Sequence, residues 1–174
     1  HGVINSTRAF LPHLKKRPES AIVNTSSIFG LLSVPSQSIY HVGKFGVRGF
    51  TESLALEMQL NNETVEVYSV HPGHIGTNIF SASRFKNFEP GTTMFGKADT
   101  PEEAGKIFKE NAPTSAKSAA NIILKNIRKK NKRILVGIDA HAYDLLQRIF
   151  PKWYIYFLPL VSIIRNLFPK DKIN

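Results

Sequence analysis

Two side chains four residues apart, Tyr40 and Lys44, are spaced to share one face of a helix. A free tyrosine has a pKa of about 10, which is too high for efficient proton transfer near neutral pH. A lysine ammonium one helical turn away favours the phenolate form and makes the phenol a better acid and base. Upstream, Ser27 could hydrogen-bond a substrate oxygen and hold it beside the Tyr40 hydroxyl. The three residues would together move a proton to or from an alcohol or carbonyl oxygen.

The chain offers no rival electrophile for this chemistry. It has no cysteine, which excludes disulfides, iron–sulfur clusters and thiolate zinc sites. His71 and His74 flank Pro72-Gly73 without a carboxylate partner, so we interpret them as loop histidines and predict no metal site. The hydride of a redox reaction would therefore have to come from a bound cofactor.

Strands and helices that alternate along the chain must position these residues. Residues 21–24 form an apolar run that turns polar at Thr25-Ser26-Ser27, which predicts a buried strand with hydroxyls at its end. Residues 38–60 have the longest helical periodicity, and residues 65–70 predict a second strand that stops at Pro72-Gly73. Ligands of open parallel sheets bind outside the carboxyl ends of the strands. Both strand ends and the start of the helix between them are therefore placed to meet a ligand.

The remaining segments continue the alternation. Residues 2–15 predict a helix that Pro12 kinks or ends early, and Thr100-Pro101 starts another with a hydroxyl cap. The other expected elements are a helix over 115–130, a strand over 134–136 and a helix that Asp139 caps and that runs to Phe150. This order predicts an α/β fold, a parallel sheet with right-handed crossovers and helices on both faces.

The positive charge is concentrated in the second part of the chain. The net charge is +10 over 174 residues. Residues 1–100 hold 9 basic and 7 acidic side chains, whereas residues 101–174 hold 14 and 6. A phosphate, an anionic lipid or a nucleic acid would therefore meet the second part.

Several motifs stand in order along the first 80 residues. They are Asn24-Thr25-Ser26-Ser27, then Gly30, then Tyr40-x-x-x-Lys44, and after the second strand Pro72-Gly73-x-Ile75-x-Thr77. This ordered set resembles the short-chain dehydrogenase/reductase family. The resemblance implies a Rossmann-like, doubly wound parallel sheet, and NAD or NADP as the cofactor.

The resemblance also assigns roles to these residues. Tyr40 would be the general acid in carbonyl reduction and the base in alcohol oxidation, and Ser27 would position the substrate oxygen. Lys44 would tune Tyr40 and hydrogen-bond the nicotinamide ribose, and Tyr40 would also contact the cofactor. The nicotinamide end of the cofactor would be lined by Pro72, Gly73, Ile75 and Thr77. The implied activity is the interconversion of a secondary alcohol and a ketone or aldehyde. The phenylalanines within residues 76–99 could line an apolar pocket for a lipophilic small-molecule substrate, or could equally belong to a satellite core.

Parts of the family pattern are absent from the sequence. These are the glycine-rich pyrophosphate turn, the Asn-Ala-Gly strand end, a catalytic asparagine and the residue that selects NAD or NADP, all expected upstream of His1. We therefore expect residues 1–150 to be the C-terminal part of a dehydrogenase domain, truncated at its nucleotide-binding half. Within it, residues 20–80 would form the catalytic segment and residues 76–99 a substrate lid. We expect the 174-residue chain alone to be inactive and its longer parent to be active.

Residues 151–174 form an apolar and basic tail with a different character. Residues 153–164 are mostly aromatic or aliphatic and are flanked by cations, but are too short to span a bilayer, which needs about 20 apolar residues. Either they pack over the cleft or a subunit partner, or residues 148–172 make a peripheral membrane contact. We expect a cytoplasmic protein, with membrane association as an open alternative.

Other functions remain as alternatives. The chain could be a non-catalytic binding module of the same fold, or a basic protein of a membrane surface. The basic run over residues 125–133 lacks a nucleic-acid reader motif, so we expect no nucleic-acid partner. The resemblance implies a homo-oligomer through the helices at 2–15 and 38–60.

Overall fold

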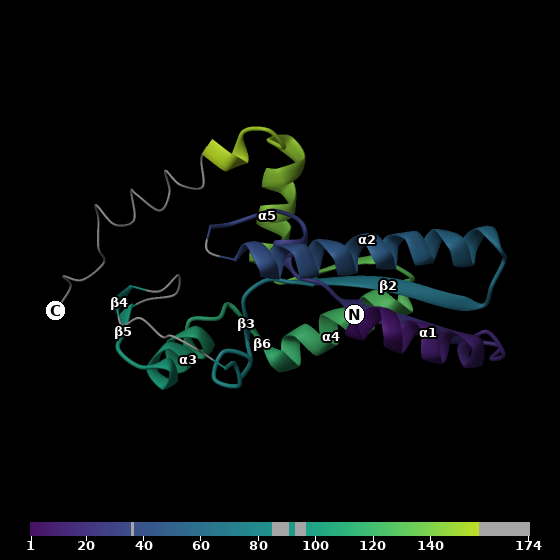
Figure 1. Cartoon of the computed structure of the whole chain (residues 1–174), viewed down its shortest axis with the longest axis horizontal. Helices are drawn as coiled ribbons and strands as arrows, with labels where there is room; N and C mark the ends of the chain where they lie inside the picture. Colours follow the sequence, from purple (N-terminus) through teal and green to yellow (C-terminus); the bar gives the residue numbers. More distant parts are fainter. Residues whose placement is uncertain (36, 85–90, 93–96, 157–174) are drawn as a thin grey trace.

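The computed structural model describes residues 1–35, 37–84, 91–92 and 97–156. The helices are α1 (Gly2–Leu14), η1 (Ile28–Gly30, a 3-10 helix), α2 (Ser38–Leu60), α3 (Pro101–Glu110), α4 (Ala116–Arg128) and α5 (Ile138–Ile149). The strands are β1 (Ser20–Thr25), β2 (Val65–Pro72), β3 (Ile75–Gly76), β4 (Gly91–Thr92), β5 (Lys97–Ala98), β6 (Thr114–Ser115) and β7 (Arg133–Val136). Every strand and helix predicted from the sequence is present (Figure 1).

Three parallel strands form the main sheet, in the order β1-β2-β7. Thr25 at the end of β1 lies opposite Val70 of β2, and Pro72 at the end of β2 lies opposite Val136 of β7. Because the strands are parallel, their carboxyl ends meet at one edge of the sheet. Ser27 follows β1 and Gly73 follows β2, so both sequence motifs lie at this edge.

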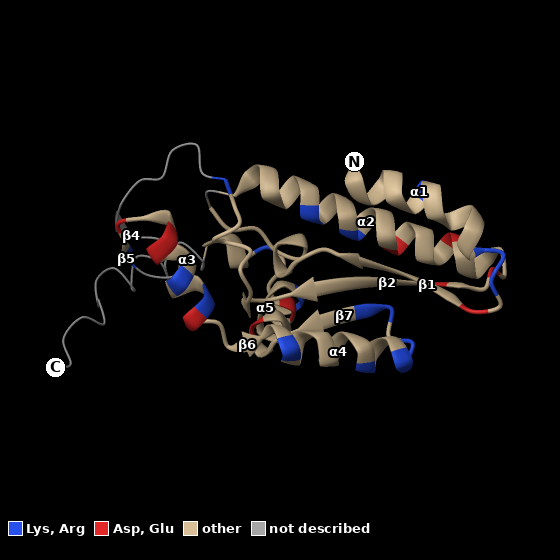
Figure 2. Cartoon of the chain, turned by 90° about the horizontal axis from the view of Figure 1, so that it is seen from below, with Lys and Arg blue, Asp and Glu red and all other residues tan. Residues whose placement is uncertain are grey.

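Helices cover both faces of the sheet, as the alternating pattern predicts. Figure 2 shows α1 and α2 on one side of the strands and α4 on the other. Each face has its own apolar core, because neighbouring strand residues point to opposite sides. On the α2 side the buried residues are Ile22, Leu54, Met58, Val65 and Val67. On the α4 side they are Tyr68, Val70, Ile75, Ala119, Ile134 and Val136.

Two details of the helices differ from the sequence prediction. α1 continues through Pro12 and ends at Leu14, so the proline costs only one hydrogen bond in the last turn. The prediction that Asp139 caps α5 is wrong: the N-cap residue is Gly137, and it makes no side-chain cap. The Asp139 carboxylate instead accepts a hydrogen bond from the backbone N–H of His74.

Short elements connect the main sheet to α3 and α4. The Thr100 side chain caps α3 by accepting from the Glu103 N–H at 3.1 Å, as predicted. β3 pairs with β6, and β4 pairs with β5. The expected lid at 76–99 includes residues 85–90 and 93–96, which lie outside the described residues, as do residues 157–174 of the tail. In the described part of the chain, no helix has both the length and the apolar character needed to cross a bilayer.

Candidate active site

Tyr40 and Lys44 lie in the first two turns of α2 and approach each other. The Lys44 Nζ atom lies over the Tyr40 ring, 5.6 Å from its centroid. Tyr40 is 42% exposed, so the residue is only partly covered by the described part of the chain. Partial burial lowers the pKa of Lys44 from its ordinary value. The predicted face-sharing of the two residues is therefore present in the structure.

Contacts with the end of β1 fix this part of α2. Lys44 Nζ donates to the Thr25 carbonyl oxygen at 3.1 Å. The Ser26 hydroxyl donates to the Lys44 carbonyl oxygen at 2.8 Å. Gly30 packs against the same two groups, and a Cβ there would lie against Ser26 Oγ and 2.8 Å from the Lys44 oxygen. This close approach explains why the position takes a glycine.

Ser27 lies at the same end of β1 but makes no direct hydrogen bond to Tyr40 among the described residues. Its side chain is buried, and its Oγ accepts from the Phe29 N–H at 3.1 Å, which caps η1. The ring of Phe29 meets the Tyr40 ring edge-on, with centroids 6.2 Å apart. The Ser27 oxygen acts as an acceptor in this contact, so its O–H hydrogen is left to donate to another group.

His41 is a site residue for which the sequence suggested no role. His41 follows Tyr40 directly in the chain, and its side chain is buried. Its ring contacts the backbone of η1 and of the loop that follows it. Nδ1 lies 2.8 Å from the Phe29 carbonyl oxygen, and Nε2 accepts from the Val34 N–H at 3.0 Å. Nε2 also lies 3.1 Å from the Val34 carbonyl oxygen, so both ring nitrogens of His41 contact the backbone of this loop. The buried residues of α2 are His41, Thr51, Leu54 and Met58, but helical spacing groups only the last three closely, so no local pattern singled out His41.

His71 is a second residue whose structural role the sequence missed. It lies in β2 rather than in a loop and is fully buried. Nδ1 lies 3.1 Å from the Ser27 carbonyl oxygen, and Nε2 lies 2.9 Å from Ser69 Oγ. Burial lowers the pKa of His71 to about 4, so the ring is neutral near pH 7. The ring therefore connects β2 to the backbone of the residue expected to orient substrate.

Asp139 holds the segment that follows β2. Its Oδ2 accepts from the His74 N–H at 2.5 Å, and Gly73 lies so close to the carboxylate that a Cβ there would collide with it. The Gly73 N–H also donates to the Val136 carbonyl oxygen at 2.9 Å. The Pro72-Gly73 segment is therefore fixed by both β7 and α5.

The other two residues expected near the nicotinamide are placed differently. The Ile75 side chain is buried in the core on the α4 side, so only its backbone could contribute to a ligand site. The Thr77 oxygen accepts from the Ile79 N–H at 3.4 Å, which leaves its hydroxyl hydrogen available.

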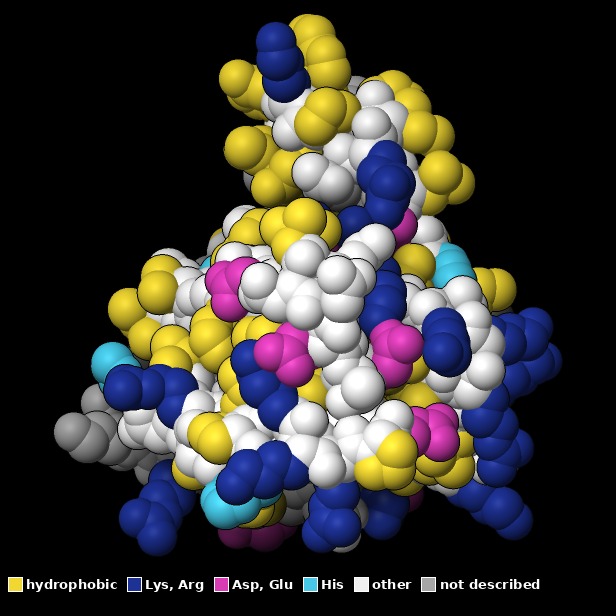
Figure 3. Space-filling model, turned by 90° about the vertical axis from the view of Figure 1, so that its right-hand side faces the viewer, with side chains coloured by type: hydrophobic (Ala, Val, Ile, Leu, Met, Phe, Trp, Pro, Cys, Tyr) yellow, Lys and Arg dark blue, Asp and Glu magenta, His cyan; other side chains and the backbone are white. Residues whose placement is uncertain are grey.

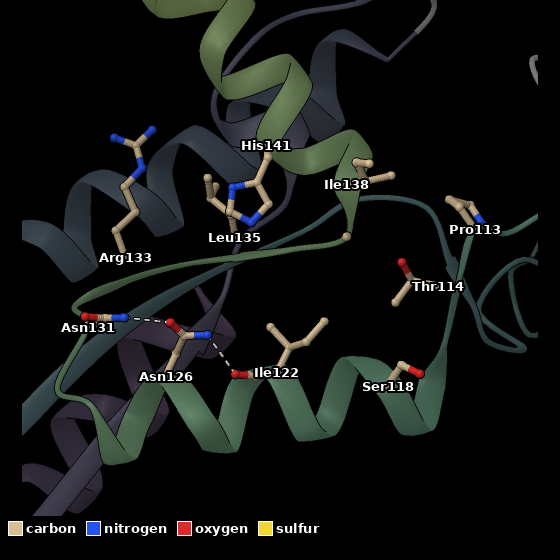
Figure 4. A pocket seen from close by; sticks show the side chains of 11 residues that line it. Pro113, Thr114, Ser118, Ile122, Asn126, Asn131, Arg133, Leu135, Ile138 and His141 are labelled. Carbon is tan, nitrogen blue, oxygen red and sulfur yellow. Dashed lines mark hydrogen bonds between the residues drawn. The ribbon is translucent and has the colours of Figure 1, made fainter.

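A hollow of about 600 Å³ opens beside the Tyr40–Lys44 pair. It lies between the first turn of α1 and the first half of α2, and its lining includes Val3, Ile4, Ile39, Val42 and Phe50. A second hollow, of about 610 Å³, lies between α4, β7 and α5 (Figure 4). It contains none of the candidate residues, so only the first hollow adjoins the proposed chemistry.

Comparisons with known proteins identify the family and agree with this fold. A family model described as short chain dehydrogenase matches residues 1–87. The Mycobacterium tuberculosis protein SadH, named as an oxidoreductase, is 39% identical over 153 residues, which cover 88% of this chain and 52% of that protein. The chain belongs to the short chain dehydrogenase family.

Solved structures establish the same fold. A Burkholderia phymatum short chain dehydrogenase/reductase in complex with NAD has a TM-score of 0.69 and 22% identity, covering 99% of this chain and 58% of that one. A Burkholderia cenocepacia short chain dehydrogenase in complex with NADP has a TM-score of 0.64 and 21% identity, covering 90% and 54%. The chain spans about half the length of SadH and of these solved chains.

Proposed function

We propose that this chain carries the catalytic residues of an NAD(P)-dependent oxidoreductase that interconverts a secondary alcohol and a ketone or aldehyde. The main support is that the Lys44 ammonium lies over the Tyr40 ring while it is anchored at the end of β1 that leads to Ser27. The activity is assigned to a longer protein, because the chain spans about half the length of its relatives. The 174-residue chain alone is expected to show no turnover.

The residues of the chain divide the proton chemistry among them. In carbonyl reduction, the Ser27 O–H donates a hydrogen bond to the carbonyl oxygen and holds it beside Tyr40. The Tyr40 hydroxyl transfers its proton to that oxygen as the carbonyl carbon gains a hydride, and the nearby ammonium of Lys44 stabilises the phenolate that remains. Alcohol oxidation reverses each transfer. A nicotinamide cofactor, when bound, supplies or accepts the hydride.

The donor groups of the site suit such a cofactor. The Lys44 ammonium has three N–H donors, of which the Thr25 carbonyl occupies one. The remaining donors would hold ribose hydroxyls of the bound cofactor and stabilise the Tyr40 phenolate. The backbone of Gly73 and Ile75 and the hydroxyl of Thr77 would meet the nicotinamide end. Neither NAD nor NADP is favoured by these residues.

A lipophilic substrate fits the side chains near the segment after β2. Phe80 stacks on Phe108 of α3 with ring centroids 5.6 Å apart, and Ile79 is exposed beside them. These side chains would form an apolar wall of the substrate site. This agrees with the expected role of residues 76–99 as a substrate lid.

Turnover of simple carbonyl compounds tests the proposal. The full-length protein would be assayed with NADH and with NADPH against 2-octanone and cyclohexanone, and with the oxidised cofactors against the matching alcohols. Tyr40→Phe is expected to reduce kcat at least about 10²-fold, the usual contribution of a positioned acid, while cofactor binding changes little. Tyr143→Phe, on the partly buried part of α5, is the matched control and should retain activity. Equal activity of Tyr40→Phe and the control would contradict the assignment, and cofactor binding without any turnover would favour the non-catalytic alternative.

A further inference from the structure

The outer face of α5 carries a stripe of exposed apolar side chains. Ile138, Leu145 and Ile149 are 79%, 57% and 57% exposed, and their spacing places them along one side of the helix. The opposite side faces the protein, where Ala140 and Asp144 are buried. A helix that only covers its own core exposes polar rather than apolar residues. The stripe therefore indicates a contact outside the described part of the chain.

Exposed aromatic residues extend this surface past the end of α5. Trp153 and Tyr156 are 61% and 71% exposed, and Ile155 between them is also exposed. We call Leu145, Ile149, Trp153, Ile155 and Tyr156 the α5 tip. Figure 1 shows α5 projecting beyond α2, and Figure 3 shows hydrophobic side chains gathered around the projecting end.

The charge around the α5 tip is positive. The acidic residue of this region, Asp144, is buried and paired with both Arg133 and Arg148, at 2.6 and 2.8 Å. Lys152 is exposed and has no ion-pair partner among the described residues. The sequence from residue 145 to residue 170 contains no Asp or Glu. The acidic side chain near the α5 tip is thus buried in ion pairs, while the exposed Lys152 adds positive charge, which complements a surface that is apolar inside and anionic outside.

We propose that the α5 tip lies in the interface of an anionic phospholipid membrane. Trp and Tyr favour the headgroup level, where one end of the ring is apolar and the other is wet, and lysine or arginine beside them attracts anionic lipids. A second copy of the chain fits less well, because a two-fold contact at the tip would bring Arg148 and Lys152 near their own copies.

Fluorescence of Trp153 tests the proposal directly, because it is the one tryptophan of the 174-residue chain. Its emission is expected to shift to the blue when vesicles of phosphatidylcholine and phosphatidylserine are added, and brominated lipids should quench it. Pure phosphatidylcholine vesicles should produce a smaller shift, and raising the salt to about 0.5 M should weaken binding, because salt screens the charge attraction.

Two matched double variants distinguish vesicle binding through the α5 tip from non-specific binding of exposed apolar side chains. Leu145→Ser with Ile149→Ser should weaken vesicle binding by about tenfold or more, the expected loss for removing two partly inserted aliphatic side chains. Leu56→Ser with Leu60→Ser changes exposed leucines of α2 and should leave binding unchanged. The proposal is overturned if Trp153 does not respond to vesicles, if both variants weaken binding equally, or if the blue shift follows protein concentration without lipid, which would indicate self-association.

Discussion

Protonation of His71 should couple the stability of the site to pH. The ring is fully buried and connects Ser27 to Ser69 while neutral. Its pKa is about 4 in the folded chain, against about 6.5 in the unfolded chain. As the pH falls below about 6.5, the unfolded chain takes up this proton first. The stability due to the neutral ring is therefore complete above that pH and is lost as the pH falls towards 4.

The size of the effect follows from the difference between the two pKa values. A shift from 6.5 to about 4 corresponds to about 3 kcal/mol, at about 1.4 kcal/mol per unit. About 2 kcal/mol of this stabilisation is lost between pH 7 and pH 4.5, because over that range the unfolded chain binds the proton and the folded ring mostly does not. The loss ends only below the folded pKa, where the buried ring is protonated as well. Among the described residues, Arg133 and Arg48 add to the effect by repelling a charged ring, whereas Glu52 opposes it.

Urea unfolding of the wild type and of His71→Gln, each at pH 7 and pH 4.5, measures this coupling. The glutamine variant should be less stable at pH 7, and its stability should fall by about 2 kcal/mol less than that of the wild type on acidification. Parallel losses in the two proteins would refute the reasoning. Should the variant not fold, NMR titration of the His71 ring decides the question: protonation near pH 6.5 contradicts the low pKa.

Substitutions at Gly30, Asp139 and Lys44, with matched controls, test the supports of the site. In urea titrations, Gly30→Ala should destabilise the chain by about 1–3 kcal/mol, because the added Cβ would press on Ser26 and on the Lys44 carbonyl. The control is Gly49→Ala, which has open space around it and should stabilise α2 by about 0.5–1 kcal/mol. Asp139→Ala should raise the cofactor KM of the full-length protein more than it lowers kcat. Asp139→Asn can still accept from the His74 N–H, so its cofactor KM should be much closer to that of the wild type. An equal effect of both variants would indicate a general loss of structure. Lys44→Met should shift the rising limb of the pH–rate profile for alcohol oxidation to higher pH, because an ammonium no longer favours the phenolate; an unchanged profile would contradict its role.

The sequence predicted the elements well because their patterns are local. The apolar run at 21–24, the periodicity at 38–60 and the Thr100-Pro101 start each depend on residues close in the chain, and all three elements appear as predicted. The spacing of Tyr40 and Lys44 is equally local, since two residues four positions apart on a helix always share a face.

The supports of the site could not be predicted, because they join residues far apart in sequence. His71 meets Ser27 across two strands, and Asp139 reaches the N–H of His74 from another helix. Aspartate near a helix start usually acts as a cap, so local rules assigned Asp139 to α5 alone. Only the register of β1, β2 and β7 brings these partners together.

Transfer of label from a deuterated cofactor is the most direct test of the proposed chemistry. The full-length protein would be given a ketone and NADH or NADPH that carries deuterium at the transferable position. The expected alcohol has one deuterium on its carbinol carbon and none on oxygen after exchange with water, and Tyr40→Phe forms it at least about 10²-fold more slowly than the wild type. An unlabelled alcohol, or a labelled one formed equally fast by both proteins, would contradict proton transfer from Tyr40 coupled to hydride transfer.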